Sequence, residues 1–188
     1  MERPEIPDEE LLLLFRDPDT KQKAFSLIID KYKERLYWHI RRMVVVHEDA
    51  DDVLQNVFIK MWKGLDHFRE ESKLYTWLYR IASNESITHL EKLKKTKRIE
   101  VKNDDDGFLM ETVKADEYFD ASKIEWKLQL AIQSLPDQQK LVFSLRYYDE
   151  MPYNDMSEML GVSSGALKAS YHHAVKKIHA YLKNELNF

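Results

Sequence analysis

The sequence predicts an all-α protein made of two helical domains joined by an acidic flexible linker. The 188 residues include only four glycines and five prolines, whereas turn-rich β folds use many of both. Apolar residues recur at every third or fourth position over long stretches, which is the spacing of one helix face. No stretch alternates apolar and polar residues as a half-buried strand would. The predicted boundaries are 1–98 for the first domain, 99–121 for the linker and 122–188 for the second domain.

Three helices are predicted in the first domain. Asp19 or Thr20 can cap the first of them. The second opens with acidic residues, which suit the positive end of a helix dipole, and Gly64 is its predicted stop. Ser72 is the predicted cap of the third. The predicted apolar face of the first helix is Phe25, Ile28, Ile29, Tyr32, Leu36, Ile40 and Met43, and that of the second is Ala50, Val53, Leu54, Val57, Phe58, Met61 and Trp62. The predicted apolar face of the third helix is Leu74, Trp77, Leu78, Ile81 and Ala82. The third helix continues into a basic tail of Lys92, Lys94, Lys95, Lys97 and Arg98.

The chain changes character after this basic tail. Residues 103–120 contain seven acidic residues and a single lysine, which indicates an extended linker, with a solvated loop inside one domain as the alternative. Ser122 and Glu125 then form a capping box for the next helix. Pro136 fits the first turn of a further helix, whose packing residues are Leu141, Val142, Leu145 and Tyr148.

The composition argues against an enzyme. The chain has no cysteine, which excludes disulfides and thiolate metal sites and is compatible with a reducing compartment. Its seven histidines show no metal-binding spacing, and a glycine-rich phosphate loop and a nucleophile elbow are both missing. We therefore expect no catalytic residue, no metal and no cofactor. The acidic N-terminus lacks the basic region of a signal peptide, and no apolar run reaches the roughly 20 residues that span a bilayer, so a soluble, cytoplasmic protein without membrane insertion is expected.

The clearest local pattern lies near the C-terminus. A short helix at Tyr153–Leu160, a turn at Gly161 and a helix from about Ser163 to Glu185 are typical of a helix-turn-helix, which places its second helix in the DNA major groove. An ordinary helical hairpin is the alternative. The predicted inward residues are Met156, Leu160, Val162 in the turn, Leu167, Tyr171 and Ala174. The predicted DNA-facing residues are Ser163, Ser164, Gly165, Lys168, His172, His173 and Lys176.

The formal net charge of −4 conflicts with a DNA binder that acts alone. Phosphate contacts supply most of the affinity of such proteins, so they are usually basic. The conflict indicates a protein that works with a large partner.

Two further groups of residues could bind partners. Aromatic rings can stack on unpaired bases while basic side chains follow the nucleic-acid backbone. One stretch of the chain supplies both kinds of side chain. The alternative is that Trp77 belongs to the core. Its residues are Phe68, Tyr75, Trp77, Tyr79, Arg80 and Asn84. The second group is the acidic helix start with Gln55, Asn56 and Lys60, for which helix-dipole pairing and solvation are a sufficient explanation without other information.

Three segments together resemble bacterial sigma factors. Residues 49–62 (DADDVLQNVFIKMW) are similar to their core-polymerase-binding segment. Residues 67–72 (HFREES) and 75–84 (YTWLYRIASN) are similar to their promoter-melting segment, and residues 135–178 to their C-terminal helix-turn-helix. The chain thus resembles the extracytoplasmic-function (ECF) group of the sigma-70 family, which keeps only a region 2-like and a region 4-like domain. The resemblance covers about Phe25 to Ile178.

The resemblance implies a role for each segment. It implies that the chain binds the β′ clamp coiled coil and the β flap of core RNA polymerase. It also implies that the chain recognises promoter −10 and −35 elements and melts the −10 element during transcription initiation. An anti-sigma factor is the further implied partner. The implied polymerase-binding residues are Asp49, Asp52, Gln55, Asn56, Phe58 and Trp62. The implied −10 residues are Phe68, Arg69, Ser72, Tyr75, Trp77, Arg80 and Asn84, and the implied −35 residues are the DNA-facing set given above.

The chain departs from the family pattern in two places. Glu70 stands where the −10 loop usually carries glycine, which changes its backbone freedom and charge. Ser170, His173 and Val175 occupy positions that are often basic, so phosphate contacts should be weaker. The alternative functions are a stand-alone helix-turn-helix regulator and a helical adaptor that binds only protein.

Overall fold

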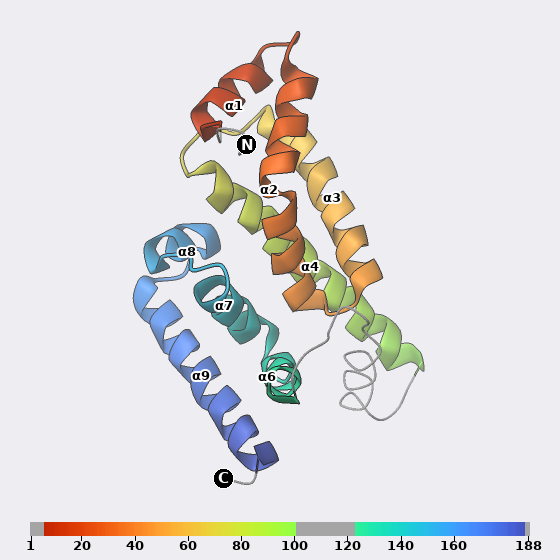
Figure 1. The fold of residues 1–188 in the computed structure, drawn as a ribbon, viewed down its shortest axis with the longest axis vertical. Helices are drawn as coiled ribbons and strands as arrows, with labels where there is room; N and C mark the ends of the chain where they lie inside the picture. The colour runs from red at the N-terminus through yellow and green to blue at the C-terminus, as the bar shows by residue number, and fades with distance from the viewer. Residues whose placement is uncertain (1–5, 101–122, 187–188) are drawn as a thin grey trace.

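The computed structural model describes residues 6–100 and 123–186, and every regular element in these ranges is an α-helix, which confirms the all-α prediction. The helices are α1 (Asp8–Arg16), α2 (Lys21–Val44), α3 (His47–Leu65), α4 (Leu74–Glu100), α6 (Lys123–Gln133), α7 (Asp137–Tyr147), α8 (Tyr153–Leu160) and α9 (Ser164–Leu186). Helices α1–α4 form one group, and α6–α9 form a second group beside it (Figure 1). Residues 99 and 100 of the predicted linker belong instead to α4, whereas residues 101–121 and Ser122 of the predicted capping box lie outside the described residues.

Helix α2 is the centre of the first domain, because α1, α3 and α4 all pack against it. Its buried stripe contains the predicted positions Ile28, Leu36, Ile40 and Met43, each with no exposed surface. The predicted faces of α3 and α4 are likewise buried or packed against this core. The helical spacing therefore identified the core of this domain correctly.

Helix α1 was not predicted, because its apolar run is short and lies among acidic residues. Leu11 and Phe15 are nonetheless almost completely buried, each with 1% of its surface exposed. The Tyr32 hydroxyl donates a hydrogen bond to the Asp8 carboxylate over 2.7 Å, which ties the start of α1 to α2. Isolated helices this short are marginal in water, so α1 depends on packing rather than on its own propensity.

Three predicted helix starts need correction. Thr20 occupies the N-cap position of α2, but its hydroxyl donates to the Leu14 carbonyl over 2.7 Å and caps no N–H group of α2. Helix α4 begins two residues after Ser72, and its first bond runs from the Trp77 N–H to the Lys73 carbonyl over 3.2 Å. Pro136 is the N-cap residue of α7 and lies just before its first turn.

Gly64 does not end α3, which continues to Leu65. A Cβ atom at this position would lie 2.8 Å from Cζ2 of Trp77, closer than real Cβ contacts come. Gly64 therefore allows the indole of Trp77 to lie against the α3 backbone, which is a packing role that a sequence pattern cannot separate from a helix stop.

The turn between α8 and α9 lies at the predicted position. Gly161 has φ 67°, in the left-handed region that glycine adopts without steric cost, and its N–H donates to the Ser157 carbonyl over 2.9 Å. The prediction that Val162 fills the turn is wrong, because 41% of its surface is exposed. Met159, one turn back on α8, is buried instead.

The two domains share one hydrophobic core. Leu141, Leu145 and Met156 of the second domain belong to the same cluster of buried residues as the α2–α4 stripes. Helix α7 packs against α2, and α8 packs against α4. A smaller cluster inside the second domain contains Ala131, Ile132, Leu135, Phe143, Ala174 and Ile178. The C-terminal domain is thus closed onto the N-terminal domain over α2 and α4.

Candidate functional sites

The residues predicted to bind polymerase divide into an exposed set and a core set. Asp52, Gln55 and Asn56 are exposed on α3. Trp62 is half-buried, with its ring centroid 4.9 Å from that of Phe25 and 5.7 Å from that of Phe15. Phe58 is also packed against the core, and Asp49 lies 3.3 Å from Nε2 of His89. The exposed set is the most accessible to a partner, while Phe58 and Trp62 also contribute to the core.

One residue of this surface was missed. Ile59 is 53% exposed although it is a large apolar side chain. It lies three and four residues after Asn56 and Gln55 and seven after Asp52, so all four share one helix face. The sequence did indicate that Ile59 is exposed, because its position does not fall on the helical repeat of the buried face that includes Val53, Val57 and Met61. We call Asp52, Gln55, Asn56 and Ile59 the α3 face.

The aromatic pair of the predicted −10 set supports the loop between α3 and α4. The rings of Phe68 and Trp77 lie 5.2 Å apart, and both side chains are half-buried against the core. Trp77 therefore has the core role that the sequence left open, with its indole against Gly64. Arg69 is exposed, with its guanidinium 4.0 Å from the Glu71 carboxylate.

The loop that follows α3 contains a strained residue. Glu70 has φ 57°, in the left-handed region where a non-glycine residue is uncommon. Its carboxylate pairs with Arg16 at the end of α1. The position was expected to differ in backbone freedom and charge from the glycine usual there, and glutamate here adopts the left-handed conformation.

The rest of the −10 set lies along α4. Ser72 is half-buried just before the helix, and Asn84 is exposed in its middle. Tyr75 lines a cavity of about 660 Å³ between α2, α4 and the α7–α8 connection. Arg80 donates to the Glu158 carbonyl of α8 over 3.0 Å. The structure therefore brings part of this set into contact with the second domain.

The predicted −35 residues lie on the first half of α9 and in the turn before it. Ser163, Gly165, Lys168, His172, His173 and Lys176 are exposed. Ser164 is half-buried, and its hydroxyl lies 3.3 Å from Oδ1 of Asn154 on α8. Ser163 accepts a hydrogen bond from the Ala166 N–H over 3.3 Å, which makes it the cap of α9. Residues 164–184 contain four lysines, three histidines and no acidic residue, so this helix is the basic element that the net charge concealed.

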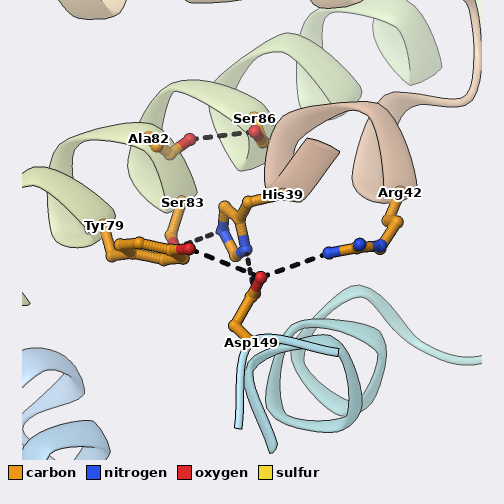
Figure 2. A network of polar contacts seen from close by, with 7 residues as sticks. All are labelled: His39, Arg42, Tyr79, Ala82, Ser83, Ser86 and Asp149. Carbon is orange, nitrogen blue, oxygen red and sulfur yellow. Dashed lines mark hydrogen bonds and ion pairs between the residues drawn. The ribbon is translucent and has the colours of Figure 1, made fainter. Parts of the chain in front are cut away.

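A polar network that sequence reasoning missed joins the two domains (Figure 2). The Asp149 carboxylate, just after α7, lies 2.8 Å from Nδ1 of His39 and 3.2 Å from Nη1 of Arg42. The Tyr79 hydroxyl donates to the same carboxylate over 3.4 Å. Burial raises the pKa of Tyr79 well above its ordinary value, and the nearby Asp149 charge raises it further. Nε2 of His39, which is fully buried, lies 3.0 Å from the Ser83 hydroxyl. We call these residues the seam network.

A buried lysine lies near the seam network. Lys140 of α7 is only 4% exposed, and its ammonium donates to Oε1 of Gln133 over 2.8 Å. Gln133 in turn donates from Nε2 to the Arg42 carbonyl over 3.0 Å. Desolvation lowers the pKa of Lys140 to about 8, against the opposing effect of the Asp137 carboxylate.

Neither a metal cluster nor a membrane-spanning helix is present in the part of the chain that the structure describes. No group of three or more histidine or acidic side chains is placed to hold a metal ion within residues 6–100 and 123–186. Over the same ranges, no helix combines the length and the apolar character that crossing a bilayer requires.

Comparison with known proteins connects both domains to one family. Sigma-70 region 2 matches residues 28–96, and Sigma-70, region 4 matches residues 125–178. The ECF RNA polymerase sigma factor SigW of Bacillus subtilis (strain 168) is 28% identical over 170 residues, which cover 87% of this chain and 91% of that protein. The ECF RNA polymerase sigma-E factor of Escherichia coli (strain K12) is 29% identical over 157 residues, covering 79% and 81%.

Two solved structures share the fold. The sigma factor RpoE of Bartonella quintana, solved in complex with the anti-sigma factor NepR, gives a TM-score of 0.70 at 21% identity and covers 86% of this chain and 98% of its own. CnrH, solved with the cytosolic domain of CnrY, gives 0.67 at 20% identity and covers 94% and 99%. The two family matches occur in the same order as the two helical domains and together span more than half of the sequence. The chain therefore belongs to the sigma-70 family of RNA polymerase sigma factors, in its extracytoplasmic-function group.

Proposed function

We propose that this sigma factor binds core RNA polymerase through the α3 face, reads a −35 element with α9, and promotes −10 opening with the loop and first half of α4. One observation carries the proposal. Each of the two sigma domains has an exposed surface suited to the partner proposed for it: the α3 face for polymerase and the first part of α9 for DNA. The α3 face has three polar residues and one exposed isoleucine, and protein–protein interfaces commonly combine apolar and polar side chains in this way. The first part of α9 is basic and begins with small residues, which lets its backbone approach DNA.

The acidic net charge is compatible with this function. Polymerase supplies much of the DNA affinity, so the sigma factor needs only local basic surfaces. Two domains that bind separate promoter elements also gain from effective concentration. By analogy with the two solved complexes, whose partners are an anti-sigma factor and the cytosolic domain of CnrY, we include an anti-sigma factor among the partners.

Substituting Ile59 tests the polymerase surface. We expect Ile59→Lys to weaken binding to core polymerase by tenfold or more, because a charge would replace the exposed apolar side chain of the α3 face. Pull-down and fluorescence titration with core enzyme measure the effect. Leu13→Lys is the matched control, because Leu13 is 64% exposed on α1 and lies outside the face. Failure of the unsubstituted chain to bind core polymerase would instead favour a stand-alone regulator or an adaptor.

Substituting Lys168 tests the −35 surface. We expect Lys168→Ala to lower the promoter affinity of the holoenzyme about threefold to tenfold and to reduce the magnitude of the salt-dependence slope by about 1, as loss of one phosphate contact would. Binding is measured on genomic promoter fragments at several salt concentrations. Lys23→Ala, at another exposed lysine, which lies on α2, is the control. A salt slope equal to that of the unsubstituted holoenzyme would contradict the role of Lys168.

A further inference from the structure

Helix α9 carries a line of basic side chains that continues past the residues predicted to face the −35 element. Its members are three or four residues apart, so they lie on one helix face. All of them are exposed, and we call them the α9 stripe: Lys168, His172, Lys176, His179 and Lys183. The stripe extends about 22 Å along the helix axis, at roughly 1.5 Å per residue. Its last two members lie beyond the predicted DNA-facing set.

The stripe faces away from the body of the second domain. Leu167, Ala174 and Ile178 are buried and mark the side of α9 that packs against α6, α7 and α8. At about 3.6 residues per turn, the centre of the stripe lies roughly 140° around the helix from these residues. Residues 164–184 contain no acidic side chain. The stripe is therefore a continuous cationic surface open to a partner outside the domain.

Helix α9 is too long to contact base edges over its whole length. Its 23 residues, Ser164–Leu186, form one uninterrupted helix (Figure 1) of about 34 Å. The major groove is only about 12 Å wide and about 8.5 Å deep, and it winds around the duplex. A straight helix that begins on base edges must therefore rise out of the groove further along. The part of the DNA within reach at that point is the sugar–phosphate backbone.

We propose that Lys176, His179 and Lys183 bind the phosphate backbone that flanks the base pairs read by the start of α9. We call this the flanking contact. It rests on the proposed function, because it requires the first part of α9 to lie in the major groove. Phosphate contacts position a protein on the duplex and carry no sequence information directly. The flanking contact therefore fixes how α9 lies on the DNA and adds affinity that is independent of the base sequence.

Charge alone does not separate DNA from an acidic protein surface as the partner of the stripe. The geometry favours DNA, because Lys168 and His172 belong to the same face of the same helix. The proposed function already places these two residues on the −35 element. The second half of a continuous helix stays in line with the first, so it runs along the same duplex.

The salt dependence of promoter binding by the holoenzyme tests the flanking contact. We expect Lys183→Gln to lower the affinity about threefold and the magnitude of the salt-dependence slope by about 1, as loss of one phosphate contact would. His179→Lys should raise that magnitude by about 1 when binding is measured near pH 8, where an ordinary imidazole is neutral and lysine is charged. Lys177→Gln, the same substitution at an exposed lysine of α9 outside the stripe, is the matched control and should leave the slope unchanged.

Phosphate-ethylation interference on the same promoter fragment locates the contact. For the parent holoenzyme, we expect interference at one or more phosphates outside the base pairs whose replacement weakens binding. Lys183→Gln should lose this interference, and Lys177→Gln should keep it. Circular dichroism checks that the variants keep their helix content, as expected because lysine and glutamine have similar helix propensities.

The outcomes separate the flanking contact from the proposed function. If Lys168→Ala lowers the salt slope but Lys183→Gln changes neither the slope nor the interference pattern, the flanking contact is overturned and the proposed function stands. An unchanged slope in both variants overturns the −35 role of α9 as well. An equal loss in Lys177→Gln would reduce the effect to net charge and overturn the flanking contact. Weaker binding of Lys183→Gln to core polymerase, with an unchanged salt slope on DNA, would assign this end of the stripe to a protein surface instead.

Discussion

Leu145→Ala should lower the free energy of unfolding by about 3 kcal/mol. Leu145 is completely buried in α7, inside the cluster that both domains share. Truncating it removes apolar contacts and leaves a cavity at a point where α7 packs against α2, and buried leucines replaced by alanine typically cost 2–5 kcal/mol. Denaturant titration followed by circular dichroism measures the change as a shift of the midpoint.

Leu13→Ala is the matched control for this substitution. Leu13 is 64% exposed, and surface substitutions usually change stability by less than about 0.5 kcal/mol. Because the core is continuous across the domain boundary, we also expect one cooperative transition for the parent chain. Two separate transitions, with Leu145→Ala shifting only the one that belongs to the second domain, would contradict a shared core.

The stability of the protein should rise as the pH is raised from about 7 to about 9.5. Burial lowers the pKa of Lys140 to about 8 in the folded state, against 10.5 for an ordinary lysine. Between these two values the unfolded chain binds a proton that the folded chain has lost, so the free energy of unfolding increases with pH. The gain over this range is about 2 kcal/mol, at 1.36 kcal/mol for each pKa unit.

Lys140→Met isolates this contribution, since it removes the titrating group and keeps an unbranched side chain. Denaturant titrations at several pH values should show the rise in the parent and a flatter profile in the variant. The range stops near pH 9.5 because the raised pKa of Tyr79 begins to matter above about pH 10. There only the unfolded tyrosine loses its proton, so the free energy of unfolding falls as the pH rises. Parallel profiles for the two proteins would show that Lys140 carries its proton equally well in both states.

Most of the secondary structure could be predicted because it has a local cause. The stripe through Ile28, Leu36 and Ile40 repeats with the helical period, and only a glycine adopts the left-handed turn at Gly161 without strain. Helix α1 could not be predicted in the same way, since its stability comes from contacts with α2. Gly64 was misread because a glycine needed for close packing looks the same in a sequence as one that ends a helix.

The candidate surfaces were predictable only in part. Exposure on α3 and α9 follows from the helical period, so the positions of Gln55 and Lys168 could be deduced. The seam network could not, because His39 and Asp149 are 110 residues apart. No local pattern specifies which faces of two domains meet. A histidine in the middle of the α2 apolar stripe was the one sign in the sequence that a polar partner would come from elsewhere.

The left-handed conformation of Glu70 has a consequence for the promoter opening that we propose for its loop. A glycine in its place would let the free loop sample many backbone states, and the loss of that freedom would accompany every encounter with DNA. Glutamate restricts the unbound loop, and its pairing with Arg16 anchors it to α1. In the proposed function, the loop would therefore meet the DNA already ordered, and its conformational entropy would be lost once, during folding, instead of in each round of initiation.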